Sequence, residues 1–456
     1  MTVSRSRQIA YDVLRRVEAG GAYASDVLHA ELSGPIQPAD AALATEIAMG
    51  VLRWRRLLDF LLERQMNQAV ERLDLPVALA LRMGAYQLRY LERIPARAAV
   101  NESVELVKRA RKSSAASLVN AVLRKFAAEA RLPAERYVAP DAGTAERLAL
   151  SHSHPTWMVE RWLARFGEEE TAALLEANNR APRLSCALPE PEQRTDVIRS
   201  LEESGLRVEP GVLLKSAFAV EGGSPARTQA FRSGRISIQD EASQAIPLLL
   251  GVREGDRVLD LCAAPGGKTP ALARAAGRSG LVVATDRHAH RLRAMAAQFE
   301  RVGLRTVQLT GLDATHALPF RDGFERILVD APCSGTGTLA RHPEIRWRLR
   351  PERLAESSEQ QRQMLANALE RLAPGGRLVY STCSLEPEEN EHVVAAVLKT
   401  WPSIRLARAS ETARTIAAHL APGLSAEGFV DRDGFFRTWP AAHRTDGFFA
   451  APLEKT

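Results

Sequence analysis

Short apolar runs alternate with longer segments of helical periodicity from about residue 234 onward, and this alternation constrains the fold more than any other feature. The runs expected to be strands are Arg257–Cys262, Leu281–Asp286, Thr306–Leu309, Arg326–Asp330 and Arg377–Thr382. The expected helices cover residues 268–277, 288–303, 353–373 and 387–399. Such alternation predicts βαβ units and a mostly parallel sheet with helices on both faces. We therefore expect an α/β domain over residues 234–456, with ligands bound outside the carboxyl ends of its strands.

The first third of the chain shows helical periodicity almost throughout. Helices are expected over residues 4–20, 39–65, 69–95, 99–112 and 115–129. Ser4 is placed to cap the first helix, Gly20-Gly21 to end it, and Pro76 to start or kink the third. Strand-like alternation is nearly absent. We expect an all-helical bundle over residues 1–135.

A second change of texture follows Ala139-Pro140-Asp141. A helical stretch is expected at about 144–179, with Pro155 near a helix start. Apolar runs at 183–188 and 212–220 then flank a helix at about 191–204, and the segment is punctuated by Pro189, Pro191, Gly205 and Pro210. We expect a helical linker and a small α+β domain over residues 141–233.

The positive charge of the chain is confined to its first third. The chain carries 61 Lys+Arg and 55 Asp+Glu, a net charge of +6. Residues 1–140 hold 21 basic and 15 acidic side chains, which accounts for the whole excess. Such asymmetry points to an acidic partner such as nucleic acid, although a merely soluble surface would give the same count.

Composition excludes several other classes of protein. Hydrophobic residues make up 45% and charged residues 25%, as in ordinary globular domains. No apolar run of about 18 residues predicts a membrane span, and the first residues lack the apolar core of a signal peptide. The four cysteines include no C-x-x-C pair that would indicate a metal site. We expect a cytoplasmic protein without a metal and without a membrane partner.

Small and acidic residues follow the first three expected strands. The first strand leads into Asp260-Leu261-Cys262-Ala263-Ala264-Pro265-Gly266-Gly267-Lys268-Thr269, which is neither G-x-G-x-x-G nor a phosphate-binding loop of the Walker type. Asp286, 19 residues after Gly267, ends the second strand and is placed to bind ribose hydroxyls. Asp313 follows the third strand and is placed to meet an adenine amino group. Each aspartate alone would more often be a helix cap, but acids at successive strand ends favour a nucleoside site.

Three of the four cysteines also lie at expected strand ends. Cys262 follows the first strand, where a buried small residue is an equally good interpretation. Cys333 lies in the loop after Asp330, and Cys383 lies in Tyr380-Ser381-Thr382-Cys383-Ser384. Two cysteines in loops at the open edge of one sheet are better interpreted as reactive thiols, one of which would act as a thiolate.

These motifs resemble one enzyme family closely. Residues 236–450 look like the S-adenosylmethionine-dependent RNA cytosine-C5 methyltransferases of the Sun/NOL/NSUN type, which have a Rossmann-like catalytic domain. The segments that carry this resemblance are 237–243, 260–269, 330–335, 341–344, 381–384 and 445–449. Residues 4–130 resemble the NusB RNA-binding fold, including Asn120-Ala121-Val122-Leu123-Arg124. The resemblance implies a NusB-like bundle, a small ferredoxin-like α+β domain and a methyltransferase domain.

The resemblance also implies an activity and roles for individual residues. It implies formation of 5-methylcytosine in 16S ribosomal RNA, at cytosine 967, with S-adenosylmethionine as cofactor. In the RNA branch of the family the attacking thiol is that of the Thr-Cys motif, here Cys383, and Cys333 assists product release. Asp330 would contact the cytosine and lie near the methionine part of the cofactor. The remaining cofactor contacts would come from Cys262, Ala263, Ala264, Pro265, Gly266, Gly267, Lys268, Asp286 and Asp313.

Contacts with RNA are expected from two regions. Lys108, Arg109, Arg111 and Lys112 lie close together in the bundle, near Arg124 and Lys125. Arg341 and His342, with Arg346 and Trp347, follow the Cys333 loop and are candidates for phosphate and base contacts; a solvated charged turn is the alternative.

Other functions remain open at this point. The chain would be a monomer that binds 16S ribosomal RNA. A non-catalytic RNA-binding assembly factor, the same chemistry on another ribosomal or transfer RNA cytosine, and methylation of a small molecule are the alternatives. The intact cysteines and glycine loop argue against the first, and the two additional domains argue against the last.

Overall fold

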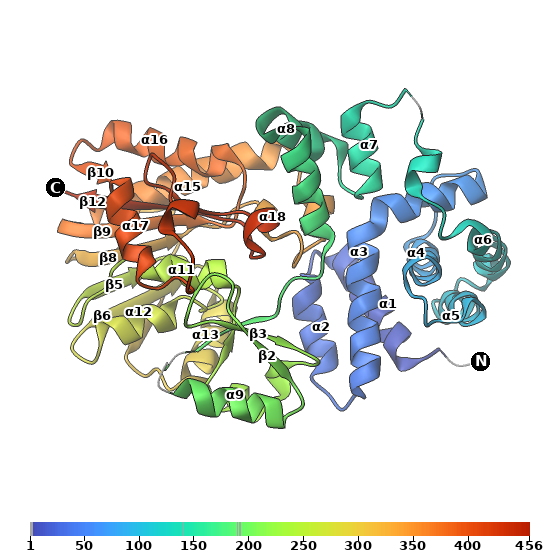
Figure 1. Cartoon of the computed structure of the whole chain (residues 1–456), viewed down its shortest axis with the longest axis horizontal. Helices are drawn as coiled ribbons and strands as arrows, with labels where there is room; N and C mark the ends of the chain where they lie inside the picture. The colour runs from blue at the N-terminus through green and yellow to red at the C-terminus, as the bar shows by residue number, and fades with distance from the viewer. Residues whose placement is uncertain (1–2, 140, 189, 191–192) are drawn as a thin grey trace. The chain divides into compact units, whose positions relative to one another are not determined.

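The computed structural model describes residues 3–139, 141–188, 190 and 193–456 and divides into two compact units. The first, called the helical unit here, comprises Met1–Ala181 together with Leu339–Arg348. The second, called the sheet unit, comprises Pro182–Thr338 and Leu349–Thr456. Figure 1 colours most of the helical unit blue to teal and the sheet unit green to red. The expected breaks at Pro140, Pro189 and Pro191 lie outside the described residues.

The helical unit confirms the all-helical prediction. Its main helices are α1 (Arg5–Gly20), α2 (Ala24–Leu32), α3 (Pro38–Met66), α4 (Leu75–Tyr90), α5 (Ala96–Arg109), α6 (Ala116–Glu129), α7 (Thr144–Ser151) and α8 (Thr156–Asn179). Pro76 begins α4, Pro155 precedes α8, and Gly21 ends α1 with a left-handed φ of 67°. The short helix α2 was not expected.

Ser4 differs from its predicted role. It occupies the N-cap position of α1, but its side chain makes no capping hydrogen bond. Its hydroxyl instead donates to Glu102 Oε2 at 2.6 Å, and Arg7 Nη1 donates to the Ser4 hydroxyl at 3.0 Å. The Ser4 hydroxyl is therefore bonded to a carboxylate of α5, a partner that lies far away in the sequence.

The segment 339–348 leaves the sheet unit and is built into the helical unit. Glu344 accepts a hydrogen bond from the first backbone N–H of α2, at Ala24, over 2.9 Å. Arg348 donates to the carbonyls of Val17, Gly21 and Ala22, which lie at and just beyond the end of α1. A carboxylate at a helix start and a cation at a helix end both interact favourably with the helix dipole and so stabilise the helix.

Arg346 is the buried anchor of this segment, at 1% exposure. Its guanidinium donates to the Asn179 side-chain oxygen at 2.9 Å and to the carbonyls of Ser153 and Asn178 at 3.2 Å each. Trp347 donates from its indole nitrogen to the Leu52 carbonyl at 2.6 Å. The prediction that Arg346 and Trp347 hold phosphate and a stacked base is therefore wrong for Arg346, whose donors face the interior. A solvated turn is equally wrong for it.

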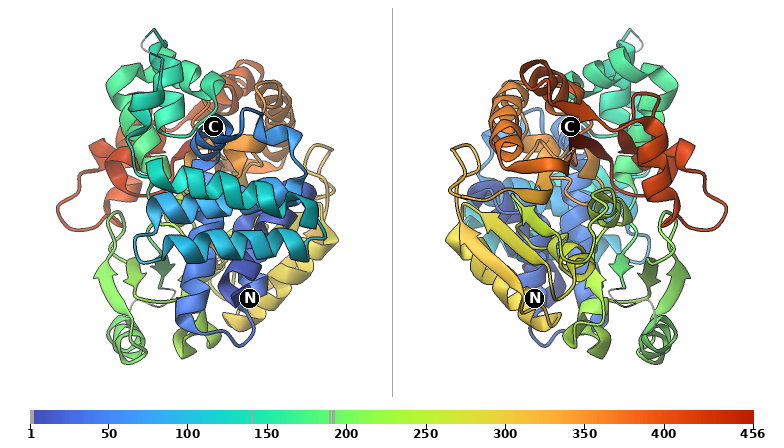
Figure 2. Two further views of the ribbon diagram at one scale, coloured as in Figure 1. Left: turned by 90° about the vertical axis from the view of Figure 1, so that its right-hand side faces the viewer. Right: turned by 90° about the vertical axis from the view of Figure 1, so that its left-hand side faces the viewer.

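The sheet unit begins with a small antiparallel sheet of order β2-β3-β1-β4. Its strands are β1 (Ser185–Ala187), β2 (Arg207–Pro210), β3 (Phe218–Glu221) and β4 (Ser237–Ile238). Helix α9 (Arg194–Glu203) packs beside them, as Figure 2 shows in green, and buries Val197 and Leu201 against Cys186, Phe218 and Val220. The small α+β fold is confirmed.

The structure places two segments differently from the expected domain boundaries. Strand β4 lies beyond residue 233, yet it pairs with β1 of the small sheet. Helices α7 and α8 belong to the helical unit rather than to the small domain. Both differences arise because tertiary contacts, which leave no local signal in the sequence, decide where these elements lie.

The main sheet has the order β10-β12-β9-β8-β5-β6-β7. Its parallel strands are β5 (Arg257–Asp260), β6 (Leu281–Asp286), β7 (Val307–Gly311), β8 (Phe324–Asp330) and β9 (Leu372–Thr382). The expected α/β domain is confirmed. The sequence did not predict the antiparallel strands β10 (Ile404–Leu406), β11 (Phe436–Thr438) and β12 (Phe448–Lys455), of which β12 pairs with β9 along six residues.

Alternate residues of these strands fill separate cores on the two faces of the sheet. Leu259, Ile327 and Leu378 pack with α15 (Glu352–Glu370) and α16 (Glu391–Thr400). Val258, Leu328 and Val379 pack with α11 (Glu241–Leu248) and α12 (Thr269–Ala276) on the other face, whereas α13 (Ala289–Arg301) covers β6 and β7. Figure 1 shows these helices on either side of the strands. With both faces covered, ligands have access only at the ends of the strands.

No helix in the described part of the chain is both long and apolar enough to cross a membrane.

Arg346→Ala should destabilise the helical unit by about 3 kcal/mol, because it leaves buried carbonyls without donors and opens a cavity. Urea unfolding followed by tryptophan fluorescence measures this, since Trp54, Trp157, Trp162 and Trp347 lie in the helical unit. Arg350→Ala, at an exposed position, is the control. Equal unfolding midpoints for the two variants would contradict the anchoring role.

Candidate active site

The glycine loop after β5 forms a tight backbone cradle. The N–H of Gly266 donates to the Ala263 carbonyl at 2.7 Å, and the N–H of Ala263 donates to the Thr285 carbonyl of β6 at 2.8 Å. Gly266 has a φ of 95°, and a Cβ there would lie 3.1 Å from both Met295 and Phe299. Only glycine fits this position without strain. Glycine at this position therefore lets the loop pack tightly against α13, just before α12 begins.

Asp260 is an unusual carboxyl at the end of β5. It is 1% exposed, and burial raises its pKa to about 7 although the Thr269 hydroxyl donates to Oδ2 at 2.7 Å. Its Oδ1 is buried without a hydrogen-bond partner among the described atoms. A buried acceptor of this kind beside a glycine cradle fits a site for a hydrogen-bonding ligand.

Asp286 and Asp313 lie at the ends of β6 and just beyond β7, as expected. Asp286 Oδ1 accepts the N–H of His288 at 2.8 Å. Asp313 Oδ1 accepts both the N–H and the hydroxyl of Thr315, and these bonds lower the pKa of Asp313. Both aspartates thus stabilise their own turns, but neither caps a helix, because His288 is the N-cap of α13 and no helix lies in the described segment between Asp313 and β8. Since β6 and β7 are neighbours in register, the two carboxylates still lie along one edge and fit a nucleoside; their roles in binding stay predictions.

Lys268 and Asp330 form an ion pair at the same edge. Lys268 Nζ lies 2.6 Å from Asp330 Oδ2, and the Ser381 hydroxyl donates to Asp330 Oδ1 at 2.8 Å. Burial lowers the pKa of Lys268, but the Asp330 carboxylate outweighs this effect and the net pKa is raised. The ammonium also lies 5.2 Å from the centre of the Phe448 ring. Lys268 therefore carries a fixed positive charge beside the cysteines.

Cys333 and Cys383 meet, although 50 residues separate them in the chain. Their Sγ atoms lie 3.4 Å apart, and both side chains are half-buried. The hydrogen bond with Cys383, burial, and the negative charges of Cys383 and Glu389 together raise the pKa of Cys333 well above its usual range. The two thiols therefore form one coupled pair in which Cys333 holds its proton.

A close backbone approach fixes the two cysteine loops together. The N–H of Gly337 donates to the Cys383 carbonyl at 2.9 Å, and the N–H of Gly447 donates to the Gly337 carbonyl at 2.7 Å. A Cβ at Gly337 would lie 2.1 Å from the Gly447 carbonyl oxygen. The glycine in this loop is therefore required by packing, and the segment before β12 completes the site.

Sequence reasoning missed two residues that contact both cysteine loops, Glu389 and Asn390. They are 0% and 1% exposed, and they bond to residues on either side of the thiols. The sequence placed both residues only in the expected helix over residues 387–399. No local signal distinguishes a buried glutamate from an exposed one in such a segment.

Burial disfavours ionisation of the other two cysteines, Cys262 and Cys186. Burial, followed by the charge of Asp260, raises the pKa of Cys262 well above its ordinary value. Burial raises the pKa of Cys186, inside the small sheet, to about 12. Within the ranges that the structure describes, no group of three or more His, Cys, Asp or Glu side chains is placed to hold a metal ion.

The residues expected to bind RNA lie in the helical unit. Lys108, Arg109 and Arg111 are exposed near the end of α5, and Lys112 pairs with Asp74 at 2.7 Å. Lys108 pairs with Glu105, and Arg109 donates to the Gln8 side chain. His342 and Arg341 are half-buried. Burial, followed by the Arg341 charge, lowers the pKa of His342 to about 4, so its ring is neutral at pH 7.

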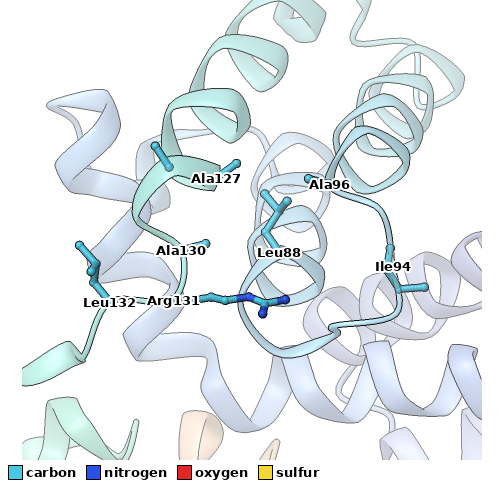
Figure 3. Close-up of a pocket in the computed structure, with 8 residues that line it drawn as sticks. Leu88, Ile94, Ala96, Ala127, Ala130, Arg131 and Leu132 are labelled. Carbon is cyan, nitrogen blue, oxygen red and sulfur yellow. The ribbon is translucent and has the colours of Figure 1, made fainter.

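A hollow of about 360 Å³ in the helical unit offers different chemistry (Figure 3). It is lined by Leu88, Ile94, Ala96, Ala127, Ala128, Ala130, Arg131 and Leu132. These side chains include no thiol or carboxylate, so the hollow does not fit the nucleoside site expected from the sequence.

Comparison with known proteins agrees with this geometry. Residues 247–454 match the family model described as 16S rRNA methyltransferase RsmB/F, residues 4–128 match the NusB family, and residues 154–227 match the RsmF/B-like ferredoxin-like domain. The probable ribosomal RNA small subunit methyltransferase B of Bacillus subtilis is 32% identical over 98% of both chains. The ribosomal RNA small subunit methyltransferase B of Salmonella arizonae is also 32% identical over 98% of both.

Solved structures show the same architecture. The crystal structure of a protein called PH0851 covers 100% of both chains with a TM-score of 0.82 and 26% identity. A methyltransferase homologue from Pyrococcus horikoshii covers 70% of this chain and 100% of its own, with a TM-score of 0.57 and 29% identity. These likenesses confirm the expected cofactor, S-adenosylmethionine. With relatives this similar over the full chain, the protein belongs to the RsmB/F family of 16S rRNA methyltransferases.

Proposed function

We propose that this protein methylates C5 of a cytosine in 16S ribosomal RNA through a covalent adduct between Cys383 and C6 of the base. The observation that carries the proposal is the pair of thiols 3.4 Å apart, next to the Lys268–Asp330 ion pair. A single thiol suffices to attack. A second thiol within contact distance supports a mechanism in which one attacks and the other assists release.

The chemistry explains why a thiolate is needed. C5 of cytosine is a poor nucleophile, but addition of a thiolate to C6 turns the ring into an enamine-like species that is nucleophilic at C5. When bound, S-adenosylmethionine supplies an electrophilic methyl group. Loss of the C5 proton after methylation allows the Cys383–C6 bond to break, which regenerates the enzyme.

The electrostatics of the site support the division of roles taken from the family. The raised pKa of Cys333 keeps its proton on sulfur, which disfavours Cys333 as the attacking thiolate. Cys383, the thiol assigned to attack, interacts with the Lys268 ammonium.

Asp330 is placed to contact the base. Its two oxygens already accept from Lys268 and Ser381, and these bonds fix the plane of the carboxylate. A fixed carboxylate can accept a hydrogen bond from the exocyclic amino group of cytosine and stabilise the charge that forms on the ring during addition. The loop 262–268 would hold the cofactor, with Asp286 on the ribose and Asp313 on the adenine.

The helical unit would supply general affinity for the RNA. The target base has to leave its stack at a cost of a few kcal/mol, so phosphate contacts elsewhere must hold the RNA in place. Lys108, Arg109, Arg111 and Lys112 are the candidates for those contacts. Arg341 would add charge, and the neutral His342 would add a stacking or hydrogen-bonding surface. We expect cytosine 967 to be the target.

Cys383→Ala should abolish methyl transfer, because it removes the thiol that the proposal assigns to the C6 adduct, and should leave cofactor binding within about twofold. Bisulfite sequencing of 16S ribosomal RNA from a strain that lacks the protein, supplied with either form, measures the modification. The native form should restore protection at cytosine 967. Calorimetric titration with S-adenosylmethionine checks cofactor binding. Restored protection by the variant would exclude Cys383 as the nucleophile.

Cys333→Ala should trap the covalent protein–RNA adduct, because release loses its assisting thiol. A slower-migrating species on denaturing gels, sensitive to ribonuclease, is the expected result. The Cys333→Ala/Cys383→Ala double variant is the matched control and should give no such species. An adduct in the double variant, or none in the single variant, would overturn the assigned roles.

Replacing Lys108, Arg109, Arg111 and Lys112 by glutamine should weaken RNA binding and make its salt dependence shallower. Four lost phosphate contacts would reduce the slope of log K against log salt by up to about 3. Filter binding across a salt series measures the slope. Arg199, Arg207, Arg232 and Arg278, all exposed in the sheet unit, provide a control of equal charge. The same slope in both variants would assign the charge to solubility alone.

A further inference from the structure

Two adjacent buried residues, Glu389 and Asn390, bind the two cysteine loops: Glu389 bonds to Ser334 and also to Ser384, and Asn390 bonds to the loop of Cys383. The Glu389 carboxylate accepts the backbone N–H of Ser334 at 2.8 Å and also the Ser334 hydroxyl. Ser334 follows Cys333 directly, so these bonds hold the loop at the residue next to the thiol. Glu389 is fully buried, at 0% exposure.

Asn390 holds the other loop in the same manner. Its side-chain oxygen accepts the Thr382 hydroxyl at 2.5 Å, and its amide nitrogen donates to the Ser384 carbonyl at 2.9 Å. Thr382 and Ser384 flank Cys383 on both sides. Since Glu389 and Asn390 are consecutive, a single peptide unit links the residue that holds one loop to the residue that holds the other.

The pair itself is fixed from two other elements of the sheet unit. The Tyr380 hydroxyl of β9 donates to the Glu389 carbonyl at 2.6 Å. Gln361 of α15 donates from one amide nitrogen to the Pro332 carbonyl at 2.9 Å and to Glu389 Oε1 at 3.2 Å. The Ser334 and Ser384 hydroxyls lie 3.0 Å apart and join the loops directly. A network with so many shared members has little freedom to change the separation of the thiols.

The two clamps differ in charge. Glu389 carries a carboxylate on the Cys333 side, whereas Asn390 carries a neutral amide on the Cys383 side. Burying a carboxylate is costly even when it accepts several hydrogen bonds, and burial raises the pKa of Glu389. A glutamine could accept the same N–H without that cost. The negative charge itself therefore calls for an explanation.

The charged and titratable neighbours of the thiols account for it. Cys333 interacts with Cys383, with Glu389 and with the Tyr380 hydroxyl. Cys383 interacts with Cys333 and with Lys268, which is paired to Asp330. A negative charge thus lies on one side of the thiol pair and a positive charge on the other. The negative charge of Glu389 therefore disfavours a thiolate at Cys333.

We propose that Glu389 and Asn390 are positioning residues, which fix the separation of the two thiols and direct the single negative charge of the pair to Cys383. The inference rests on the proposed covalent mechanism and deepens it. The choice between two chemically identical thiols, which the sequence could not make, is then made by the residue type at two consecutive positions.

Alkylation by iodoacetamide across a pH series tests this, because only a thiolate reacts. Trypsin separates the two thiols into peptides 327–341 and 378–399, so mass spectrometry follows each rate. In the native protein Cys383 should react at lower pH than Cys333. In Glu389→Gln the pKa of Cys333 should fall, so its reaction at pH 8 should accelerate by about threefold to tenfold, one pKa unit being tenfold. An unchanged Cys333 profile in a folded variant would overturn the proposal.

Glu388→Gln is the matched control, since it removes the same charge one residue earlier and should leave both profiles in place. The exchange Glu389→Gln/Asn390→Asp moves the charge to the Cys383 side and should slow Cys383 while it accelerates Cys333. Cofactor binding and circular dichroism show whether each variant is folded. Should the variants not fold, the native protein still decides, because Cys333 reacting at lower pH than Cys383 would sink the idea.

Alkylation needs no RNA, so it separates this inference from the proposed function. Methyl transfer by the Cys383→Ala variant would refute the covalent mechanism, whichever thiol is alkylated at the lower pH. Methyl transfer by Glu389→Gln should show a lower kcat with little change in KM for RNA, because substrate binding does not involve the clamp. A rise in KM alone would assign Glu389 to substrate binding and overturn the positioning role.

Discussion

The pairing of β8 with β9 in parallel register is the constraint on which the site depends. It sets Asp330 opposite Ser381, so the loops that follow these residues leave the sheet side by side. Cys333 and Cys383 come within 3.4 Å for this reason, and Ser381 can donate to Asp330. The neighbouring strands β5, β6 and β7 extend the same edge toward Asp260, Asp286 and Asp313. A slip of this register by one residue would send alternate side chains to the wrong face and separate the thiols.

Buried polar groups are concentrated at this edge, and they order the site more than they stabilise the fold. Asp260, Lys268 and Glu389 are ionisable groups in a largely apolar surrounding, each held by hydrogen bonds. Replacing such groups by apolar side chains often leaves stability unchanged, so their contribution is to specify one arrangement. At this edge that arrangement fixes two thiols, one ammonium and the carboxylates of Asp260, Asp330 and Glu389, which suits chemistry on a base that has to be held still during addition and release.

Polarity alone proved a poor guide to the segment 339–348. Its charges suggested contact with RNA, and Arg341 and His342 keep that prediction. Arg346 and Arg348 instead bind carbonyls of the helical unit, and Glu344 caps α2. After the Cys333 loop the chain therefore enters the helical unit at Leu339 and returns to the sheet unit after Arg348. Arginine serves either purpose with the same donors, so only the positions of the acceptors distinguish an anchor from a phosphate ligand.

The sequence by itself determined the three kinds of domain, the parallel strands with their glycine loop, and the chemistry-bearing residues Lys268, Asp330, Cys333 and Cys383. The domains and strands follow from periodicity and turn residues, which are local properties of the chain, whereas the roles of Lys268 and Asp330 follow from the resemblance of its motifs to a known family. The tertiary structure alone decided the role of Ser4, the strands β10 to β12, the burial of Arg346 and the clamp formed by Glu389 and Asn390. Those features depend on tertiary partners, such as Glu102 for Ser4 and Ser334 for Glu389, or on whether a charged run faces solvent or the interior. A hydrogen bond between loops leaves no periodic pattern in the sequence, and the residue type alone does not show whether a glutamate is buried or exposed.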